Sequence, residues 1–268
     1  MQTPLSNTSA LEAFSAQADK FDGYSEQNIL TKYCREEIYK VANKFLLPGS
    51  SILELNCGTG IDAFYFASKG HSVLATDGAM GMVDKLNFKL SGNHSSLHLN
   101  TKILPFENVS GLQPQTFTFI YSNFGGLNCA ADLKTVLREL PGLLKEKGKA
   151  LLVIMPPVCS WEILHALKGD FKLAFRRFNK NGTDAYVEGK QFKTYYYSPK
   201  YIATTLQGKM KVVHLQGLCT IVPPEYMFKK MMRFPKLFKL LKKLESKWNK
   251  TFLFRSTGDY FIIVLEKL

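Results

Sequence analysis

Residues 52–60 read Ile-Leu-Glu-Leu-Asn-Cys-Gly-Thr-Gly, and this stretch decides how the rest of the chain is interpreted. Its first half is a short apolar run typical of a buried strand, and its second half is a glycine turn followed by a helical pattern. Because glycine permits positive φ and close backbone approach, the N–H groups of such a turn can reach an anionic ligand at the helix N-terminus. The stretch therefore predicts a strand–turn–helix unit that binds a ligand at its turn.

The same alternation of strands and helices continues along the chain. Further strands are expected at 71–77, 96–100, 116–123 and 149–156, with helices at 60–70, 81–92 and 131–145. Two more strands are expected at 210–222 and 259–268. This order favours an α/β fold in which a doubly wound, mostly parallel sheet carries helices on both faces.

Four segments organise this single domain. They are an N-terminal helical cap (1–48, interrupted by a turn at 21–28), a core (49–157), an insertion with an aromatic, strand-like stretch at 184–198 (158–208), and the last strands with a basic helical insert (209–268).

Two ligands compete for the glycine turn. Gly58-x-Gly60-x-x-Ala63 fits the dinucleotide fingerprint, with Asp77 at the end of the next strand to bind a ribose, which would indicate a dehydrogenase. Glu54 argues against this, because a carboxylate is poorly placed beside a pyrophosphate but well placed beside an ammonium group.

Taken with the strand that ends the chain, residues 52–60 resemble the class I S-adenosylmethionine-dependent methyltransferase family. The resemblance implies a Rossmann-like, seven-stranded sheet with an antiparallel last strand and S-adenosylmethionine as cofactor. It also implies that Glu54 contacts the methionine ammonium, usually through water or backbone, that Gly58 and Gly60 let the loop pass close to the cofactor, and that Asp77 binds the ribose hydroxyls.

Other cofactor contacts follow from the same resemblance. Asn56 replaces the first glycine of the family's G-x-G-x-G, and Asn is the residue that best tolerates left-handed φ after glycine. The segment from Asn100 and Thr101 to Phe106 is similar to the family's G-D-A-x-x-L-P-F, which places Asn100 at the adenine amino group. Three more contacts are expected near the methionine end, from Ser122, Tyr24 and Arg35.

The catalytic step leaves a fainter trace, because the cofactor itself supplies an activated methyl group. His165, just past the fifth strand, is the candidate general base, and part of the run Tyr195–Tyr197 could line a pocket. Residues 122–128 lack the N/D-P-P-Y/F turn of many enzymes that methylate base amino groups, which disfavours that reaction. The five cysteines are scattered and form no metal-ligand cluster, so no metal is expected and a reducing cytosol fits.

Positive charge is concentrated in one segment. The net charge is +13, and residues 228–250 hold nine Lys or Arg against one Glu, so 9 − 1 = +8 lies there. Pro235 should start a helix whose apolar face carries Leu237, Leu240 or Leu241, Leu244 and Trp248, with lysines opposite. Two alternatives stay open: peripheral membrane contact through 236–249, or an apolar face packed on the domain with solvated lysines. Nucleic acid is disfavoured, because the charges interleave with large aliphatic residues.

The resemblance, taken with these patterns, implies a cytoplasmic S-adenosylmethionine-dependent methyltransferase that acts on a small, lipophilic or aromatic molecule. The alternatives are an RNA-modifying methyltransferase and, less favoured, a nucleotide-dependent dehydrogenase. Neither a secretory signal nor an apolar run of membrane-spanning length is expected. The acceptor, the methylated atom and the oligomeric state are not indicated.

Overall fold

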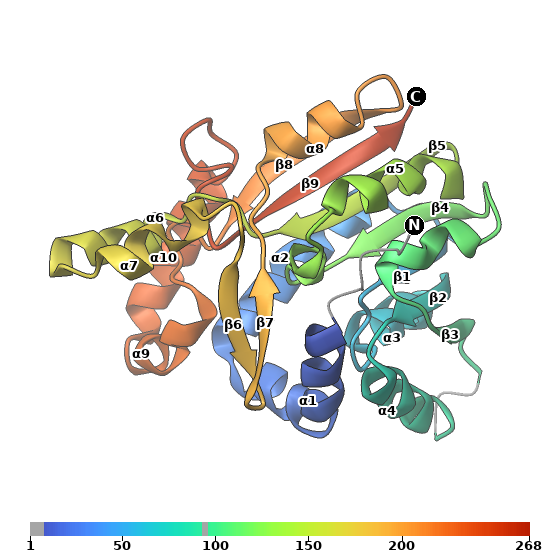
Figure 1. Cartoon of the computed structure of the whole chain (residues 1–268), viewed down its shortest axis with the longest axis horizontal. Helices are drawn as coiled ribbons and strands as arrows, with labels where there is room; N and C mark the ends of the chain where they lie inside the picture. The colour runs from blue at the N-terminus through green and yellow to red at the C-terminus, as the bar shows by residue number, and fades with distance from the viewer. Residues whose placement is uncertain (1–7, 93–95) are drawn as a thin grey trace.

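A seven-stranded sheet forms the centre of the computed structural model, which describes residues 8–92 and 96–268 (Figure 1). Its order is β3-β2-β1-β4-β5-β9-β8, and β9 is antiparallel to both of its neighbours. The strands are β1 (Ser51–Leu55), β2 (Ser72–Asp77), β3 (Leu99–Ile103), β4 (Phe117–Ser122), β5 (Leu144–Ile154), β8 (Met210–Leu218) and β9 (Tyr260–Lys267). The predicted fold class is therefore confirmed, including its antiparallel last strand.

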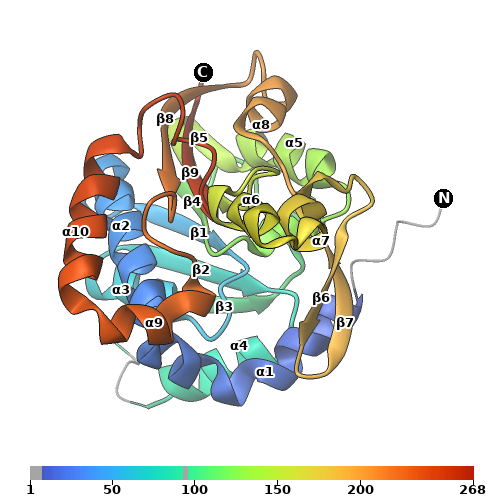
Figure 2. The same cartoon turned by 90° about the vertical axis from the view of Figure 1, so that its left-hand side faces the viewer.

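Helices cover both faces of this sheet, because successive strand residues point to opposite sides. Ile52 packs in one core cluster and Leu53 in the other. The first face carries α2 (Ile29–Phe45), α3 (Ile61–Ser68), α4 (Met80–Leu90) and α10 (Pro235–Trp248), and the second carries α5 (Leu133–Leu143) and α8 (Pro199–Thr205) (Figures 1 and 2).

The remaining elements lie around the carboxyl edge of the parallel strands. They are α1 (Thr8–Gln27), α6 (Ser160–Ile163), α7 (Phe171–Phe175), α9 (Phe228–Arg233), a separate hairpin of β6 (Thr183–Val187) and β7 (Lys190–Thr194), and the 3₁₀ turns η1 (Phe106–Gly111), η2 (Gly126–Cys129), η3 (Leu164–Lys168), η4 (Arg176–Phe178) and η5 (Glu225–Met227). The hairpin holds α1 in place, with Phe14 and Phe192 rings 5.5 Å apart and Lys20 Nζ 2.7 Å from Glu188 Oε2.

Two local predictions in the N-terminal half are wrong. The turn expected at 21–28 does not form, because α1 continues through Gly23 and the chain breaks only at Asn28. Asn28 caps α2: its Oδ1 accepts from the N–H of Leu30 at 2.9 Å and of Thr31 at 3.2 Å. The third strand covers 99–103 instead of 96–100, so its register is shifted toward the carboxyl edge.

The aromatic stretch at 184–198 also differs from its prediction as one strand. It folds back at Glu188 and Gly189, which both have positive φ, and it pairs with itself outside the main sheet. Because β7 ends at Thr194, the run Tyr195–Tyr197 lies beyond the strand. Its side chains therefore need not alternate between two faces, as they would in a strand.

Of the apolar face predicted for α10, only Leu241 packs on the domain. Phe238 and Leu241 contact the core, whereas Leu237 and Leu240 are exposed. Glu245 anchors the packed face, because its carboxylate accepts hydrogen bonds from the N–H groups of residues 220–222 at 2.7–3.2 Å. Within the described ranges, no helix is both long and apolar enough to cross a bilayer.

Candidate active site

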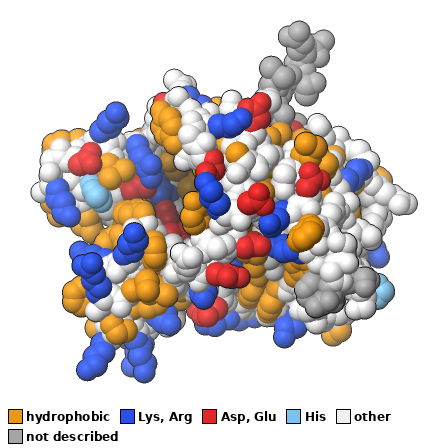
Figure 3. Space-filling view, turned by 90° about the horizontal axis from the view of Figure 1, so that it is seen from below, with side chains coloured by type: hydrophobic (Ala, Val, Ile, Leu, Met, Phe, Trp, Pro, Cys, Tyr) orange, Lys and Arg blue, Asp and Glu red, His pale blue; other side chains and the backbone are white. Residues whose placement is uncertain are grey.

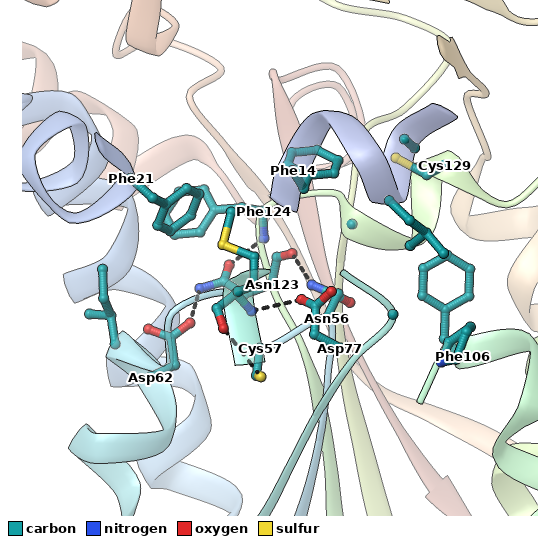
Figure 4. Close-up of a pocket in the computed structure, with 18 of the residues that line it drawn as sticks. Phe14, Phe21, Asn56, Cys57, Asp62, Asp77, Phe106, Asn123, Phe124 and Cys129 are labelled. Atoms are coloured by element: carbon teal, nitrogen blue, oxygen red, sulfur yellow. Dashed lines mark hydrogen bonds between the residues drawn. The ribbon is translucent and has the colours of Figure 1, made fainter. Parts of the chain in front are cut away.

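One cavity lies at the carboxyl ends of β1, β2 and β4, under α1 (Figure 4). Its enclosed volume is about 140 Å³, and the space continues outward through an open mouth. Its lining is Ala10, Leu11, Phe14, Phe21, Arg35, Asn56, Cys57, Gly58, Ile61, Asp62, Asp77, Gly78, Met82, Pro105, Phe106, Glu107, Asn123, Phe124, Gly126 and Cys129. Four of the predicted cofactor residues, Arg35, Asn56, Gly58 and Asp77, therefore meet in one place.

The glycine turn keeps a left-handed backbone despite its asparagine. Asn56, Gly58 and Gly60 have φ of 49°, 55° and 83°. A Cβ on Gly60 would lie 2.2 Å from Leu86 Cδ1, so this position needs glycine for its space as well as its φ, although it does not line the cavity.

Asn56 also fastens the turn to β4. Its Nδ2 donates to the carbonyl of Asn123 at 3.0 Å, and Ser122 Oγ donates to its Oδ1 at 2.6 Å. Ser122 is fully buried and lies behind Asn56, outside the cavity lining. Ser122 can therefore position Asn56, which faces the cavity.

Asp77 is held rigidly at the end of β2. Its Oδ2 accepts the N–H of Gly58 and its Oδ1 accepts the N–H of Ala79, each at 2.8 Å. Burial raises the pKa of this carboxyl, while the backbone hydrogen bonds oppose that rise. Each oxygen keeps a further lone pair, so a carboxylate here can accept hydroxyl hydrogens from a ligand.

A buried ion pair stands at the other end of the cavity. Arg35 of α2 donates to Asp62 of α3, which also accepts from Tyr39 Oη at 2.6 Å and Asn123 Nδ2 at 2.8 Å. The guanidinium lies 4.8 Å from the ring centroid of Phe124. With Asp62 so heavily bonded, the position of Arg35 is fixed and its remaining N–H groups can receive an anion.

Glu54 lies beside this pair and does not line the cavity. Alternation along β1 puts it on the same face as Ile52, under α2 and α3. It is buried, and its Oε2 has no hydrogen-bond partner among the described residues. Burial, and then the nearby Asp62, raise the pKa of Glu54 well above its usual value. Such an unpaired buried oxygen is costly and indicates a missing partner.

The sequence predicted a helical cap in the N-terminal segment, but not which residues of α1 line the cavity. Ala10, Phe14 and Phe21 are spaced four and seven residues apart, so they share one face of α1. A Cβ on Gly58 would lie 3.6 Å from Phe21 Cε1, so the Phe21 ring covers the turn. The predicted contact Tyr24 is 53% exposed and is absent from the lining. The helical spacing of these phenylalanines is the signal that could have located the wall.

The segment after β3 contributes different residues from those predicted. Asp77 pairs with Ile103, so Asn100 and Thr101 lie inside β3 and away from its carboxyl end. Thr101 Oγ1 instead donates to Asn87 Oδ1 at 2.6 Å, and neither residue lines the cavity. Pro105 and Phe106, from the same quoted motif, do line it.

The candidate base His165 is not brought to the cavity. It lies in η3, on the insertion, and does not line the cavity. We therefore assign it no catalytic role.

One cluster of possible metal ligands lies near it, formed by Cys159, Glu162 and Asp259. Arg177 Nη2 is 2.7 Å from Glu162 Oε1 and 2.5 Å from Asp259 Oδ1, and Arg176 Nη2 is 2.6 Å from Glu162 Oε1, so two guanidinium groups already balance the two carboxylates. The cluster therefore connects the insertion to the start of β9, and we assign no metal to it.

Comparisons with known proteins agree with this geometry. Residues 52–148 match a family model described as a methyltransferase domain. An uncharacterized protein of Methanocaldococcus jannaschii is 28% identical over 196 residues, which are 69% of this chain and 71% of that protein. The demethylmenaquinone methyltransferase of Clavibacter sepedonicus is 29% identical over 142 residues, half of this chain and 55% of that enzyme.

The fold is also similar to solved structures. A Listeria monocytogenes protein described as a candidate S-adenosylmethionine-dependent methyltransferase superposes with a TM-score of 0.60 at 16% identity, over 86% of this chain and 96% of that one. At this identity the likeness concerns the fold alone. Residues 52–148 therefore form a methyltransferase domain, in a chain whose fold is that of the class I S-adenosylmethionine-dependent methyltransferases.

Proposed function

We propose that this chain, an S-adenosylmethionine-dependent methyltransferase, transfers the methyl group to a small lipophilic or aromatic molecule. The observation that carries the proposal is the composition of the cavity wall. Phe14, Phe21, Phe106 and Phe124 line it together with Met82. Such a wall suits an apolar acceptor, because aromatic side chains gain most from burying apolar surface.

The polar residues of the cavity fit the cofactor at its two ends. Asp77 can accept the ribose hydroxyls, with Pro105 and Phe106 beside the adenine. Arg35 can bind the methionine carboxylate, and Glu54, which is buried beside Arg35 and does not line the cavity, can reach the ammonium only through water or backbone. When bound, the cofactor supplies a methyl group activated by its sulfonium.

The residues of this chain then orient the acceptor and exclude water. Figure 4 shows Phe14 and Phe21, both from α1, above the polar residues Asn56, Asp77 and Asn123. We propose that the predicted cap of residues 1–48, of which the structure describes residues 8–48, covers the bound cofactor with α1 as its roof. Exclusion of water and alignment of the nucleophile with the methyl group supply most of what the protein must contribute.

Two features favour a small molecule over RNA as the acceptor. The cavity is roofed by α1 and mostly apolar, whereas a nucleic-acid strand requires an open, basic groove. The curated relative from Clavibacter sepedonicus is named for demethylmenaquinone, a lipophilic quinone. This name supports a lipophilic acceptor for the present chain.

The proposal is tested by binding and by label transfer. Calorimetry should show binding of S-adenosylhomocysteine and none of NADH. With methyl-labelled cofactor, label should pass to reduced quinones or phenols in an organic extract and be absent from transfer RNA. Label in the RNA fraction alone would overturn the small-molecule assignment, and binding of NADH alone would overturn the cofactor assignment.

A further inference from the structure

One end of the molecule combines exposed apolar and basic side chains. It is built by α6, α7, α9 and α10, which lie together on the left in Figure 1 and face the viewer in Figure 2. Figure 3 shows Lys and Arg side chains next to hydrophobic ones over this end. The cofactor cavity takes none of its lining from these four helices, so the proposed function does not explain this surface.

The helix α10 presents three distinct faces. Phe238, Leu241 and Glu245 face the domain, as described above. At 100° per residue, Leu237, Leu240, Leu244 and Trp248 form a second stripe next to the packed face, and all four are 38–52% exposed. Lys236, Lys243 and Lys247 form a row on the far side of this stripe. The apolar stripe therefore lies in solvent, with lysines along its border.

The lysines of this helix are not neutralised within the protein. Among residues 8–92 and 96–268, no ion pair involves Lys236, Lys239 or Lys243. The one acidic residue of 228–250, Glu245, is fully buried and bound to backbone N–H groups. The segment therefore presents its positive charge outward.

A second apolar group lies at the same end. Phe171 and Phe175 of α7 have stacked rings with centroids 6.4 Å apart, and Phe178 follows at 6.0 Å from Phe175. All three are about half exposed. Rings that stack on each other in solvent bury little surface, so they can gain free energy by entering an apolar phase.

We propose that α10, with the exposed rings of α7 at the same end of the molecule, is a docking surface for an anionic lipid bilayer. An exposed apolar stripe bordered by lysines is what an interfacial helix needs, because the stripe enters the acyl boundary while the lysines meet the anionic headgroups. A second copy of the chain fits less well, since two such surfaces would bring like charges together. Nucleic acid fits less well, because the large aliphatic side chains would stay in water.

Flotation of the full chain with lipid vesicles tests the proposal. Vesicles of phosphatidylcholine alone are compared with vesicles that contain about one third phosphatidylglycerol, at about 0.05 M and about 0.5 M salt. We expect binding only to the anionic vesicles, weakened by salt. Lys236→Glu/Lys239→Glu/Lys243→Glu should lower the vesicle affinity at least tenfold, because each lysine lost near an anionic surface costs roughly a factor of five. Leu240→Ser/Leu244→Ser should lower it by a similar factor.

Matched controls distinguish the effect of this surface from the effect of the net charge of the protein. Lys134→Glu/Lys145→Glu/Lys200→Glu changes the net charge equally on exposed lysines elsewhere and should leave vesicle binding unchanged. Binding of S-adenosylhomocysteine should be the same in all variants, which shows that they are folded. The proposal is overturned by absence of anionic-vesicle binding at low salt, or by equal losses in the two triple variants. It is also overturned if a short RNA duplex binds through these lysines while vesicles do not, or if Leu240→Ser/Leu244→Ser converts a dimer to a monomer.

Discussion

The cofactor end and the end built by α6, α7, α9 and α10 both concentrate charged side chains. These charges are buried and paired at the cofactor end, but they are solvated at the other end. At the cofactor end, Asp62 accepts hydrogen bonds from a guanidinium, a phenol and an amide in the interior. At the other end, Lys236 and Lys239 extend into solvent and have no ion pair with any described residue.

This difference shows how charge is used in each region. A buried charge must be satisfied by fixed partners, so it specifies one geometry and can orient a ligand. Solvated charges specify no geometry, but they attract a partner of opposite sign over a distance of about one Debye length. The first arrangement suits a cofactor of defined shape, and the second suits an extended surface such as a bilayer.

The largest effect is expected where the buried pair is broken. Arg35→Met should lower the free energy of unfolding by about 4 kcal/mol, because it leaves the Asp62 carboxylate buried without its counter-charge. Chemical denaturation measures this loss. Lys40→Met, on the same helix, removes an exposed pair with Glu37 and should cost less than about 1 kcal/mol. Equal losses would contradict the contrast between buried and exposed charge.

Glu245 is the exception at the basic end, and its removal should have the next largest effect. Glu245→Ala leaves the N–H groups of residues 220–222 without their acceptor and should destabilise the protein by about 3 kcal/mol. Hydrogen exchange should then show faster exchange in α10. Glu245→Gln keeps one acceptor oxygen and should lose less. If both variants match the parent in a thermal melt, Glu245 does not anchor α10.

At the cofactor end, Asp77→Ala should weaken binding of S-adenosylhomocysteine by about 2 kcal/mol, roughly 30-fold, because hydrogen bonds to a charged acceptor are lost. Calorimetry measures the dissociation constant. Asp84→Ala, on the exposed side of the neighbouring α4, is the control and should leave binding unchanged. Unchanged affinity in Asp77→Ala would remove Asp77 from the proposed ribose site.

The two regions also differ in how far they could be predicted from the sequence. Residues 52–60 form a local motif and Asp77 ends the next strand, so the resemblance of these segments to a known family could place Asn56, Gly58 and Asp77 at one cavity. The placement of Asn100 failed because it depended on the register of β3, which is set by pairing with β2. Tyr24 and Phe21 are both plausible on a helix, and only the packing of α1 decides which one faces the cavity.

At the basic end, the sequence predicted the helix and its lysines but not which apolar residues are buried. Two overlapping stripes, one through Leu237 and Leu240 and the other through Phe238 and Leu241, have the same helical spacing. The deciding residue is Glu245, whose burial against the backbone of residues 220–222 rotates the second stripe inward. Such a long-range contact leaves no periodic signal.

A smaller effect should reveal how Asn56 is accommodated in place of glycine. A Cβ on Gly126 would lie 2.4 Å from Asn56 Cγ, so Gly126→Ala should cost about 2 kcal/mol of stability by overpacking. In an Asn56→Gly background the same change should cost roughly 1.5 kcal/mol less, since the clash is gone. Gly125→Ala is the control: φ is 66° there, so its cost should be the same in both backgrounds. If Gly126→Ala costs the same stability in both backgrounds, a direct contact between residues 126 and 56 is contradicted.

The smallest effect is expected on the exposed stripe of α10, and it gives the sharpest form of the comparison. Leu240→Ser should change the free energy of unfolding by no more than about 0.5 kcal/mol, because half of that side chain is already in water. Leu241→Ser, one residue along, should cost about 2 kcal/mol or more, because it removes a side chain packed on the core. Denaturation curves in the absence of lipid measure both.

Exposed aliphatic residues that can be removed without loss of stability do not serve folding, so their exposure requires another reason. If Leu240→Ser instead costs as much as Leu241→Ser, the stripe belongs to the core and the lysines beside it are simply its solvated border.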